Sequence, residues 1–252
     1  MSTLNMVSML ETAGRFGAFA WASLAAVAAS IVRPGETLRQ LYLILIGSLP
    51  LGLVGGVALG VVIWLHLNGF VGRDNASKVP EYLALIIVLE FAPLGAGLVV
   101  AGRSGASLGA ELSSMRLTEQ VDALESMGLS PTRYLVGPRT LAIMVAMPIM
   151  TIYLGLFALV SSYVAEMSGG VLYSTQYVAA AMAGLEQAKL IPATLKTMVF
   201  GYLIGVAGCY CGLHAPAGAE GVGIAATRGV VVSTLLVLSS NVLLVKMIQL
   251  YG

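Results

Sequence analysis

Long apolar runs dominate this sequence, and most charged residues lie in the segments between them. A membrane-spanning helix needs about 20 mainly apolar residues to cross roughly 30 Å of hydrocarbon, with every backbone group bonded inside the segment. Five runs meet this requirement, and one of them carries an acid, Glu90, near its middle. The predicted spans are residues 38–67, residues 80–101, the interval between Arg139 and Glu166, the interval between Lys196 and Glu220, and residues 224–248.

A shorter, alanine-rich apolar stretch occupies residues 16–32. Met6, Met9 and Leu10 precede it at helical spacing, which favours an amphipathic helix lying in the membrane interface. Two alternatives stay open: a sixth span, and a signal peptide, because "AVAAS" resembles a small-residue cleavage site. We expect an all-α integral membrane protein with a single membrane domain over residues 1–252. Residues 1–36 would form the interfacial helix and residues 37–252 the five-span core.

The composition supports a protein whose solvent is lipid. Hydrophobic residues make up 58% of the 252 positions and the mean hydropathy is +0.92, whereas ordinary soluble domains are roughly 45–50% apolar. The net charge of +1 and the lack of a basic run give no indication of a nucleic-acid partner. Cys209 and Cys211 stand too close for an unstrained disulfide and lack further metal ligands nearby, so we expect inert thiols.

The basic residues predict the orientation of the chain, because cytoplasmic loops carry an excess of lysine and arginine. With a cytoplasmic N-terminus, eight basic residues fall on the inner side and five on the outer side. The inner set is Arg15, Arg33, Arg39, Arg103, Arg116, Arg133, Arg139 and Arg228, and the outer set is Arg73, Lys78, Lys189, Lys196 and Lys246. With five spans, the C-terminus would then lie outside.

A cluster of acids marks residues 110–131, which this orientation places in the cytoplasm. The cluster consists of Glu111, Glu119, Asp122 and Glu125. Apolar residues recur there at helical spacing, namely Leu112, Met115, Val121, Leu124 and Met127, which predicts one amphipathic helix with Glu111, Thr118, Asp122 and Glu125 on its polar side. Such a stripe is either a solvated helix face or a surface for a protein partner, since acids do not favour anionic lipid.

The same segment contains the signals of a helix end and a new helix start. Gly128 predicts a left-handed C-terminal stop. Ser130 and Pro131 then predict an N-cap and a first helical position. We therefore expect the acidic helix to end at Gly128 and the third span to follow directly.

Glu90 is the most informative residue inside a predicted span. A carboxylate at the membrane midplane costs several kcal/mol unless it is hydrated, neutralised or paired. Pro93 follows three residues later and frees a backbone carbonyl about one turn upstream. Two interpretations stay open: Glu90 and Pro93 belong to a transport path, or Glu90 makes an internal ion pair or hydrogen bond that fixes helix packing.

The chain lacks the motifs of an enzyme. It has no G-x-x-x-x-G-K-[ST], so we expect no ATPase activity of its own. His66 and His214 stand without nearby ligands, so we expect neither a metal site nor a catalytic triad. Gly221 and Gly223 imitate a dinucleotide fingerprint, but no strand precedes them.

Three stretches carry a resemblance to a known family: "AGRSGASLGAEL", "MRLTEQVDALESMGLSPTRYLVGPR" and "GAEGVGIAATRGVV". In order and spacing, residues 90–232 resemble the MlaE or YrbE family, the permease subunits of MCE-type ABC lipid transporters. The resemblance implies a non-catalytic subunit that moves phospholipid or a related lipid between the bacterial inner membrane and a periplasmic MCE carrier. In Gram-negative relatives this activity is linked to outer-membrane lipid asymmetry.

The family resemblance also implies partners and contact residues. The partners are a second copy of the chain, an ABC ATPase that uses ATP and Mg, an MCE-domain protein and membrane lipids, with a small STAS-type regulatory subunit as a further candidate. The ATPase coupling residues would be Glu111, Arg116, Glu119, Asp122, Glu125 and Gly128. A second cytoplasmic contact would comprise Glu220, Gly221, Gly223 and Arg228, for which a simple glycine-rich turn is the alternative.

Two other classes of function compete with the ABC permease. A secondary transporter driven by a proton at Glu90 predicts two related halves, and the sequence has no visible internal repeat. A structural anchor for another subunit predicts tolerance of change at Glu90. Glycines repeat every four residues at Gly52, Gly56 and Gly60, at Gly201 and Gly205, and at Gly208 and Gly212, which predicts close helix packing within one chain or between two.

Overall fold

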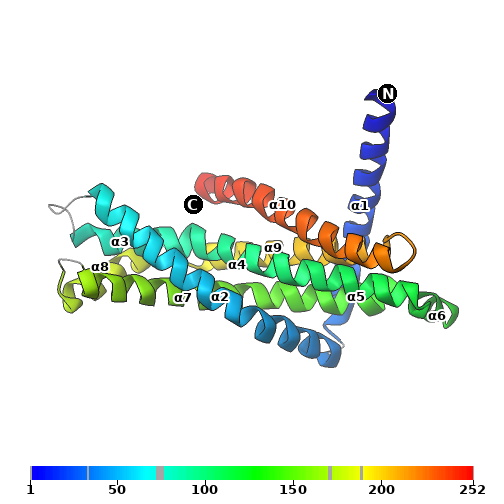
Figure 1. Cartoon of the computed structure of the whole chain (residues 1–252), viewed down its shortest axis with the longest axis horizontal. Coiled ribbons are helices and arrows are strands. Elements are labelled where there is room, and N and C mark those ends of the chain that lie inside the picture. Colours follow the sequence, from blue (N-terminus) through cyan, green and yellow to red (C-terminus); the bar gives the residue numbers. More distant parts are fainter. Residues whose placement is uncertain (1, 33, 72–76, 170–171, 188–189, 252) are drawn as a thin grey trace. The chain divides into compact units, whose positions relative to one another are not determined.

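A computed structural model describes residues 2–32, 34–71, 77–169, 172–187 and 190–251. These residues are almost entirely helical, which confirms the predicted all-α class (Figure 1). The elements are α1 (Ser2–Ser30), α2 (Pro34–Val71), α3 (Val79–Ile86), η2 (Ile87–Phe91), α4 (Ala92–Val100), η3 (Ala101–Gly105), α5 (Ala106–Leu117), α6 (Gln120–Ser126), η4 (Thr132–Val136), α7 (Gly137–Gly169), α8 (Ser174–Gln187), α9 (Leu190–Leu213) and α10 (Ala219–Tyr251). The η elements are five-residue π-helical segments within longer helical runs.

Five helical runs in the described part of the chain are long and apolar enough to cross a membrane, as predicted. They are Pro34–Val71, Val79–Leu117, Thr132–Gly169, Leu190–Leu213 and Ala219–Ile248. The fourth run begins at Leu190, whereas the sequence predicted a start at Lys196, because Lys196 is buried inside the helix. Three basic residues used for the orientation, Arg33, Arg73 and Lys189, lie outside the described residues.

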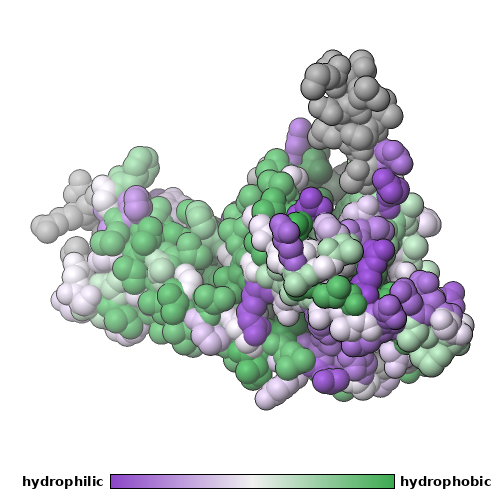
Figure 2. All heavy atoms as spheres, turned by 45° about the vertical axis from the view of Figure 1, so that its right-hand side comes forward, coloured by the Kyte–Doolittle hydropathy of each residue, from purple (hydrophilic) through white to green (hydrophobic). Residues whose placement is uncertain are grey.

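Large apolar side chains cover much of the molecular surface, as lipid-facing helices require. Val242 and Leu243 on α10 are 69% and 65% exposed, and Ile152 on α7 is 64% exposed. Figure 2 shows hydrophobic residues over large parts of the visible face. Because contact with water would make such surfaces unstable, their exposure fits a hydrocarbon environment.

The contacts divide the chain into two compact units. The first contains residues 1–44, 101–145 and 201–236, and the second contains residues 45–100, 146–200 and 237–252. In the second unit, Leu83, Ile87 and Leu154 belong to a buried apolar core, and α3 packs against α8. Trp64 Nε1 on α2 donates a 2.6 Å hydrogen bond to buried Glu166 on α7, which joins these two helices.

Glycine faces bring helix backbones together inside each unit. In the second unit, a Cβ placed on Gly60 of α2 would lie 2.0 Å from the carbonyl oxygen of Ala158 on α7. In the first unit, a Cβ on Gly205 of α9 would lie 2.8 Å from Thr140 Cα on α7. Side chains at these glycines would force the helices apart. The predicted close packing is therefore present within one chain at both places.

The N-terminal helix α1 is part of the first unit. Its residues Ala26 and Ser30 contact Gly137 at the start of α7, and the Tyr202 hydroxyl of α9 donates a hydrogen bond to the Ala20 carbonyl. α1 is not among the five candidate spans. Its placement in the membrane interface stays a prediction, and the side chains of Met6, Met9 and Leu10, on which that prediction depends, lie outside the described residues.

Candidate functional site

The acidic segment forms two short helices, so the prediction of one continuous amphipathic helix was wrong. α5 ends at Leu117 and α6 begins at Gln120. Between them, Glu119 adopts a left-handed conformation with φ 59°, and the Thr118 hydroxyl donates a 3.0 Å hydrogen bond to the Ser114 carbonyl. Threonine competes in this way with the continuing helix for backbone partners. The two helices therefore present their acids on separate surfaces.

Glu111 serves as an internal partner on α5. Its Oε1 accepts a 2.6 Å hydrogen bond from Arg139 Nη2 on α7, and the Arg139 side chain is only 6% exposed. Arg139 also donates to the Leu135 carbonyl at 3.0 Å. A buried guanidinium needs such a carboxylate, because an unpaired buried charge is strongly destabilising. Glu111 therefore stabilises the α5–α7 contact. The prediction that Glu111 shares one polar stripe with Asp122 and Glu125 was wrong.

α6 ends as predicted, in a left-handed glycine. Gly128 has φ 73°, its N–H donates to the Glu125 carbonyl at 2.9 Å, and the Leu129 N–H donates to the Leu124 carbonyl at 3.0 Å. This pair of bonds is the Schellman motif, which satisfies the last carbonyls of a helix. The next helical residue is Pro131, and the Ser130 carbonyl accepts from the Tyr134 N–H at 3.0 Å. The helix stop and the helix start were both predicted correctly.

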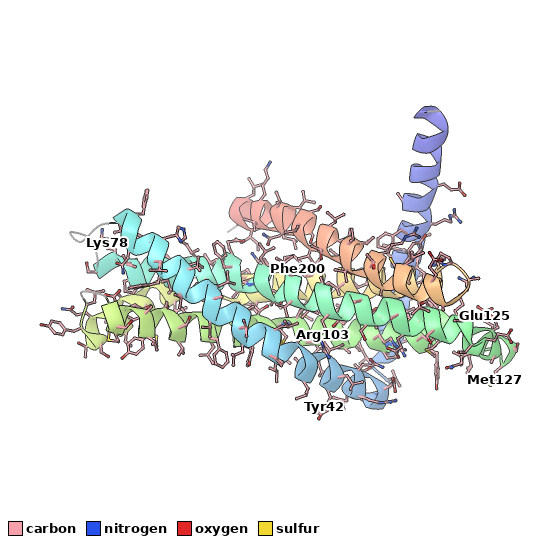
Figure 3. The ribbon with its side chains drawn as sticks, viewed as in Figure 1. Tyr42, Lys78, Arg103, Glu125, Met127 and Phe200 are labelled. Carbon is pink, nitrogen blue, oxygen red and sulfur yellow. The ribbon has the colours of Figure 1, made fainter. Side chains whose placement is uncertain are left out.

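The surface of α6 combines acids with an exposed apolar tip. Asp122 and Glu125 are exposed, Val121 is buried against the unit, and Met127 is 65% exposed. Figure 3 shows Glu125 and Met127 together at the α6 end of the acidic segment. Methionine is enriched in protein interfaces, so this surface is a candidate for a protein contact. We call the surface formed by Asp122, Glu125 and Met127 the α6 tip.

Arg116 connects α5 to the loop between α9 and α10. Its Nη1 donates to the carbonyl of Leu213, the last residue of α9. A cation in this position satisfies a helix C-terminal carbonyl and interacts favourably with the helix dipole. Beside this contact lies a groove of about 310 Å³, which is lined by Ser113, Arg116, Leu117, Glu119, Asp122, Ala215, Pro216 and Ala217.

The two cytoplasmic contacts predicted separately from the sequence are therefore neighbours in the first unit. Glu220, Gly223 and Arg228 line a second, shallow groove of about 560 Å³ along the first turns of α10. Gly221 is different, because it is buried against the Pro216 carbonyl. Pro216 and Ala217 were missed by the sequence analysis, since small apolar loop residues carry no chemical signal of their own.

Gly221→Ala is expected to destabilise the protein by about 1–3 kcal/mol, the usual cost of forcing extra atoms into a packed site. A Cβ at this position would lie 1.9 Å from the Pro216 carbonyl oxygen, so the α9–α10 loop would have to move. Gly223→Ala is the matched control, because a Cβ there meets nothing within 4 Å. Thermal unfolding of both variants in detergent tests this difference. Equal melting temperatures would show that the loop does not depend on the close approach at Gly221.

The second candidate site surrounds Glu90 in the second unit. Pro93 has no N–H, which frees the Leu89 carbonyl from its helical bond, and the Ala92 N–H reaches back five residues to the Ile87 carbonyl in a π-helical turn. The Lys196 side chain of α9 reaches the carbonyl that Pro93 leaves free. Its Nζ donates to the Leu89 carbonyl at 2.8 Å and to Glu90 Oε2 at 3.1 Å.

Exposure differs sharply between the partners of this ion pair. The Lys196 side chain is 3% exposed, whereas the Glu90 side chain is 40% exposed. The internal ion pair considered for Glu90 is present, and Lys196 satisfies both the carboxylate and the carbonyl freed by Pro93. The sequence analysis assigned Lys196 to the outer boundary of a span and missed this role. Whether Glu90 also contacts transported lipid stays a prediction.

Comparison with known proteins supports the resemblance seen in the sequence. The family profile named Permease MlaE matches residues 37–247. A probable ABC transporter permease protein of Rickettsia felis is 36% identical over 246 residues, covering 96% of this chain and 93% of that protein. Proteins described in the same words from a Synechocystis strain and from Porphyra purpurea are 32% and 30% identical, over 82% and 77% of this chain.

Proposed function

The chain belongs to the MlaE permease family, as the non-catalytic transmembrane subunit of an ABC transporter, and from this premise we propose that it moves phospholipid or a related lipid. The movement would connect the bacterial inner membrane with a periplasmic MCE carrier and maintain outer-membrane lipid asymmetry. The observation that supports an amphiphilic substrate best is the half-exposed Glu90 carboxylate, which is the one charged residue in the apolar stretch 82–102 of a candidate span. Such intramembrane acids usually face a path or a cavity.

An ABC permease works with an ATPase subunit, and the α6 tip is our proposed contact for it. The chain has no phosphate-binding loop, so ATP and Mg would be used by the partner. Asp122 and Glu125 supply exposed negative charge, and Met127 supplies an apolar anchor. Arg116 and the α9–α10 loop would stabilise this surface, since Arg116 of α5 donates a hydrogen bond to the Leu213 carbonyl. Glu220 and Arg228 would extend the contact along α10.

The remaining assembly is proposed from the family. It consists of a homodimer of this chain, an MCE-domain protein on the outer side and a small STAS-type subunit on the cytoplasmic side. The cytoplasmic N-terminus predicted from the basic residues places α6 inside and α8 outside. Exposed Tyr173 and Met182 on and beside α8 give the outer side an apolar, aromatic surface, which suits a position at the lipid headgroups or under a partner. Within this assembly, residues 1–252 act as one permease domain.

Reconstitution tests the proposed substrate. Vesicles containing the permease and its co-purified ATPase are expected to transfer fluorescent phospholipid to or from the MCE protein, and only when ATP is present. A catalytically inactive ATPase is the control. Lipid transfer that follows a proton gradient and ignores ATP would contradict the proposal and support a secondary transporter. ATP-dependent transport of a water-soluble solute, without lipid transfer, would reject the lipid substrate.

A further inference from the structure

A groove of about 200 Å³ lies between α2, η3 and α5 in the first unit, and it shares no lining residue with the α6 tip. Gln40, Leu43, Arg103, Ser107, Leu108 and Glu111 are among its lining residues. We propose that this groove binds the phosphate of a phospholipid headgroup in the inner leaflet. The proposal concerns a second lipid site, distinct from the path at Glu90, and its leaflet assignment rests on the proposed orientation of the chain.

Arg103 carries the charge on which this proposal depends. The guanidinium is exposed, and its Nη1 donates to the Leu43 and Ile44 carbonyls of α2 at 3.3 and 3.5 Å. These distances are long for hydrogen bonds. Among the described residues Arg103 makes no ion pair with a carboxylate. An exposed guanidinium without a carboxylate partner attracts anionic groups at a membrane surface, so an anionic lipid group would stabilise it.

The one acid among the lining residues does not compensate Arg103. Glu111 Oε1 accepts from Arg139 Nη2 at 2.6 Å, and Arg139 is itself buried. Glu111 is therefore paired with the buried guanidinium of Arg139 on α7. Gln40 Nε2 likewise donates to Glu36 Oε1 at 3.0 Å. The groove thus keeps a positive charge, with the exposed Ser107 hydroxyl available as a second donor.

The position of Arg103 along its helix matches the depth of lipid phosphates. Arg103 follows Val79, where the second candidate span begins, by 24 residues, or roughly 35 Å at about 1.5 Å per helical residue. The hydrocarbon core is about 30 Å thick, so Arg103 reaches the headgroup layer on the far side. Tyr42 on α2 is 63% exposed, as expected of an aromatic residue at that layer; Figure 3 labels both residues.

The size and walls of the groove fit a headgroup better than a whole lipid. A volume of about 200 Å³ is below the roughly 300–1,000 Å³ of pockets that enclose drug-sized ligands. Leu43 and Leu108 form apolar walls, and Leu43 is half exposed. A guanidinium binds phosphate oxygens in pairs. The phosphate would therefore lie against Arg103 and Ser107, while the acyl chains follow the apolar surface of α2.

Competition between lipids in native mass spectrometry of the detergent-solubilised full chain tests the site. Wild-type protein is expected to retain phosphatidylglycerol over diacylglycerol, which lacks the phosphate. Arg103→Gln should reduce this preference about fivefold, because the charged partner of the phosphate is lost. Arg133→Gln is the matched control: Arg133 is also exposed and also lies in a π-helical segment, but it does not line the groove. The preference of Arg133→Gln for phosphatidylglycerol over diacylglycerol should equal that of the wild-type protein.

A second variant keeps the test decisive if Arg103→Gln does not fold. Ser107→Phe fills the groove from an exposed position and leaves Arg103 in place, and it should lower the preference by a similar factor. An unchanged preference in either folded variant would overturn the site. Displacement of phosphatidylglycerol by millimolar inorganic phosphate would assign the groove to soluble phosphate and overturn the lipid. Loss of ATPase binding with lipid retention unchanged would assign it to a protein partner and overturn it too.

The leaflet and the proposed function are checked separately. Cysteines placed at exposed Ser114 and Ser174, in a chain without Cys209 and Cys211, report which side each faces. Labelling of Ser114 from outside would move the site to the outer leaflet and overturn the inner-leaflet assignment. Normal lipid transfer to the MCE protein in Arg103→Gln, with headgroup preference lost, would support a lipid site separate from the transport path. Failure of transfer in wild-type protein would reject the proposed function and leave the groove's lipid preference measurable.

Discussion

Asp122→Lys combined with Glu125→Lys is expected to weaken the binding of the ATPase subunit by about tenfold or more, equivalent to roughly 1.4 kcal/mol or above. Both carboxylates are exposed on the seven-residue α6, beside the 65% exposed Met127. The proposed contact pairs these acids with positive charge on the ATPase subunit. Reversing both charges turns this attraction into repulsion, which lowers the affinity and the association rate. The measurement is the amount of ATPase that co-purifies with the permease, together with ATP hydrolysis in the presence of lipid.

The control for this double variant reverses the same number of charges elsewhere on the proposed cytoplasmic side. Glu11 and Glu36 make solvent-exposed pairs with Arg15 and Arg39, and such pairs contribute little stability. Glu11→Lys with Glu36→Lys should leave ATPase binding near the wild-type level. Equal loss in both double variants would point to net charge alone. Normal coupling in the Asp122 and Glu125 variant would remove α6 from the ATPase contact.

Features encoded in local sequence were predictable in kind and in approximate place, although the second candidate span continues to Leu117 and does not end near residue 101. The five candidate spans follow from apolar length, and the stop at Gly128 follows from the one residue type that adopts φ 73° without strain. The glycine repeat at Gly56 and Gly60 predicted close helix packing, because only a missing side chain permits Gly56 to approach Leu154 and Gly60 to approach Ala158. In each case a few neighbouring residues contain the whole physical cause.

Features that depend on distant partners were not predictable in the same way. Lys196 lies 106 residues from Glu90, and as the charge at the start of an uncharged interval it was assigned to the boundary of a span. Glu111 lies 28 residues from Arg139, and its helical spacing alone placed it with Asp122 on one polar stripe. The break at Thr118 and Glu119 removed that stripe. Periodicity assigns a face to each residue, whereas the partner of each charge depends on how the helices pack.

Glu90→Gln and Glu90→Leu are expected to separate transport from stability. Glutamine keeps the size of the side chain and an oxygen that accepts from Lys196 Nζ, now 3.1 Å from Glu90 Oε2. We expect Glu90→Gln to fold normally and to lower lipid transfer, because the exposed carboxylate charge is removed from the path. Glu90→Leu also removes the acceptor, which leaves a buried ammonium with the Leu89 carbonyl as its remaining described acceptor. Removing the counter-charge of a buried cation costs about 3–5 kcal/mol.

The paired measurement is lipid transfer in reconstituted vesicles and melting temperature, for both variants. Lys196→Met is the matched control, because it breaks the same ion pair from the buried side and keeps the 40% exposed carboxylate in place. If the carboxylate acts on lipid, Lys196→Met should lower the melting temperature and retain more transfer than Glu90→Gln. If the pair only fixes α9 against the π-helical turn at 87–91, Lys196→Met and Glu90→Leu should both be unstable and Glu90→Gln should transfer lipid at the wild-type rate. That second pattern would leave Glu90 as a structural partner of Lys196, because a residue on the lipid path cannot lose its charge without effect on the passage of a charged headgroup.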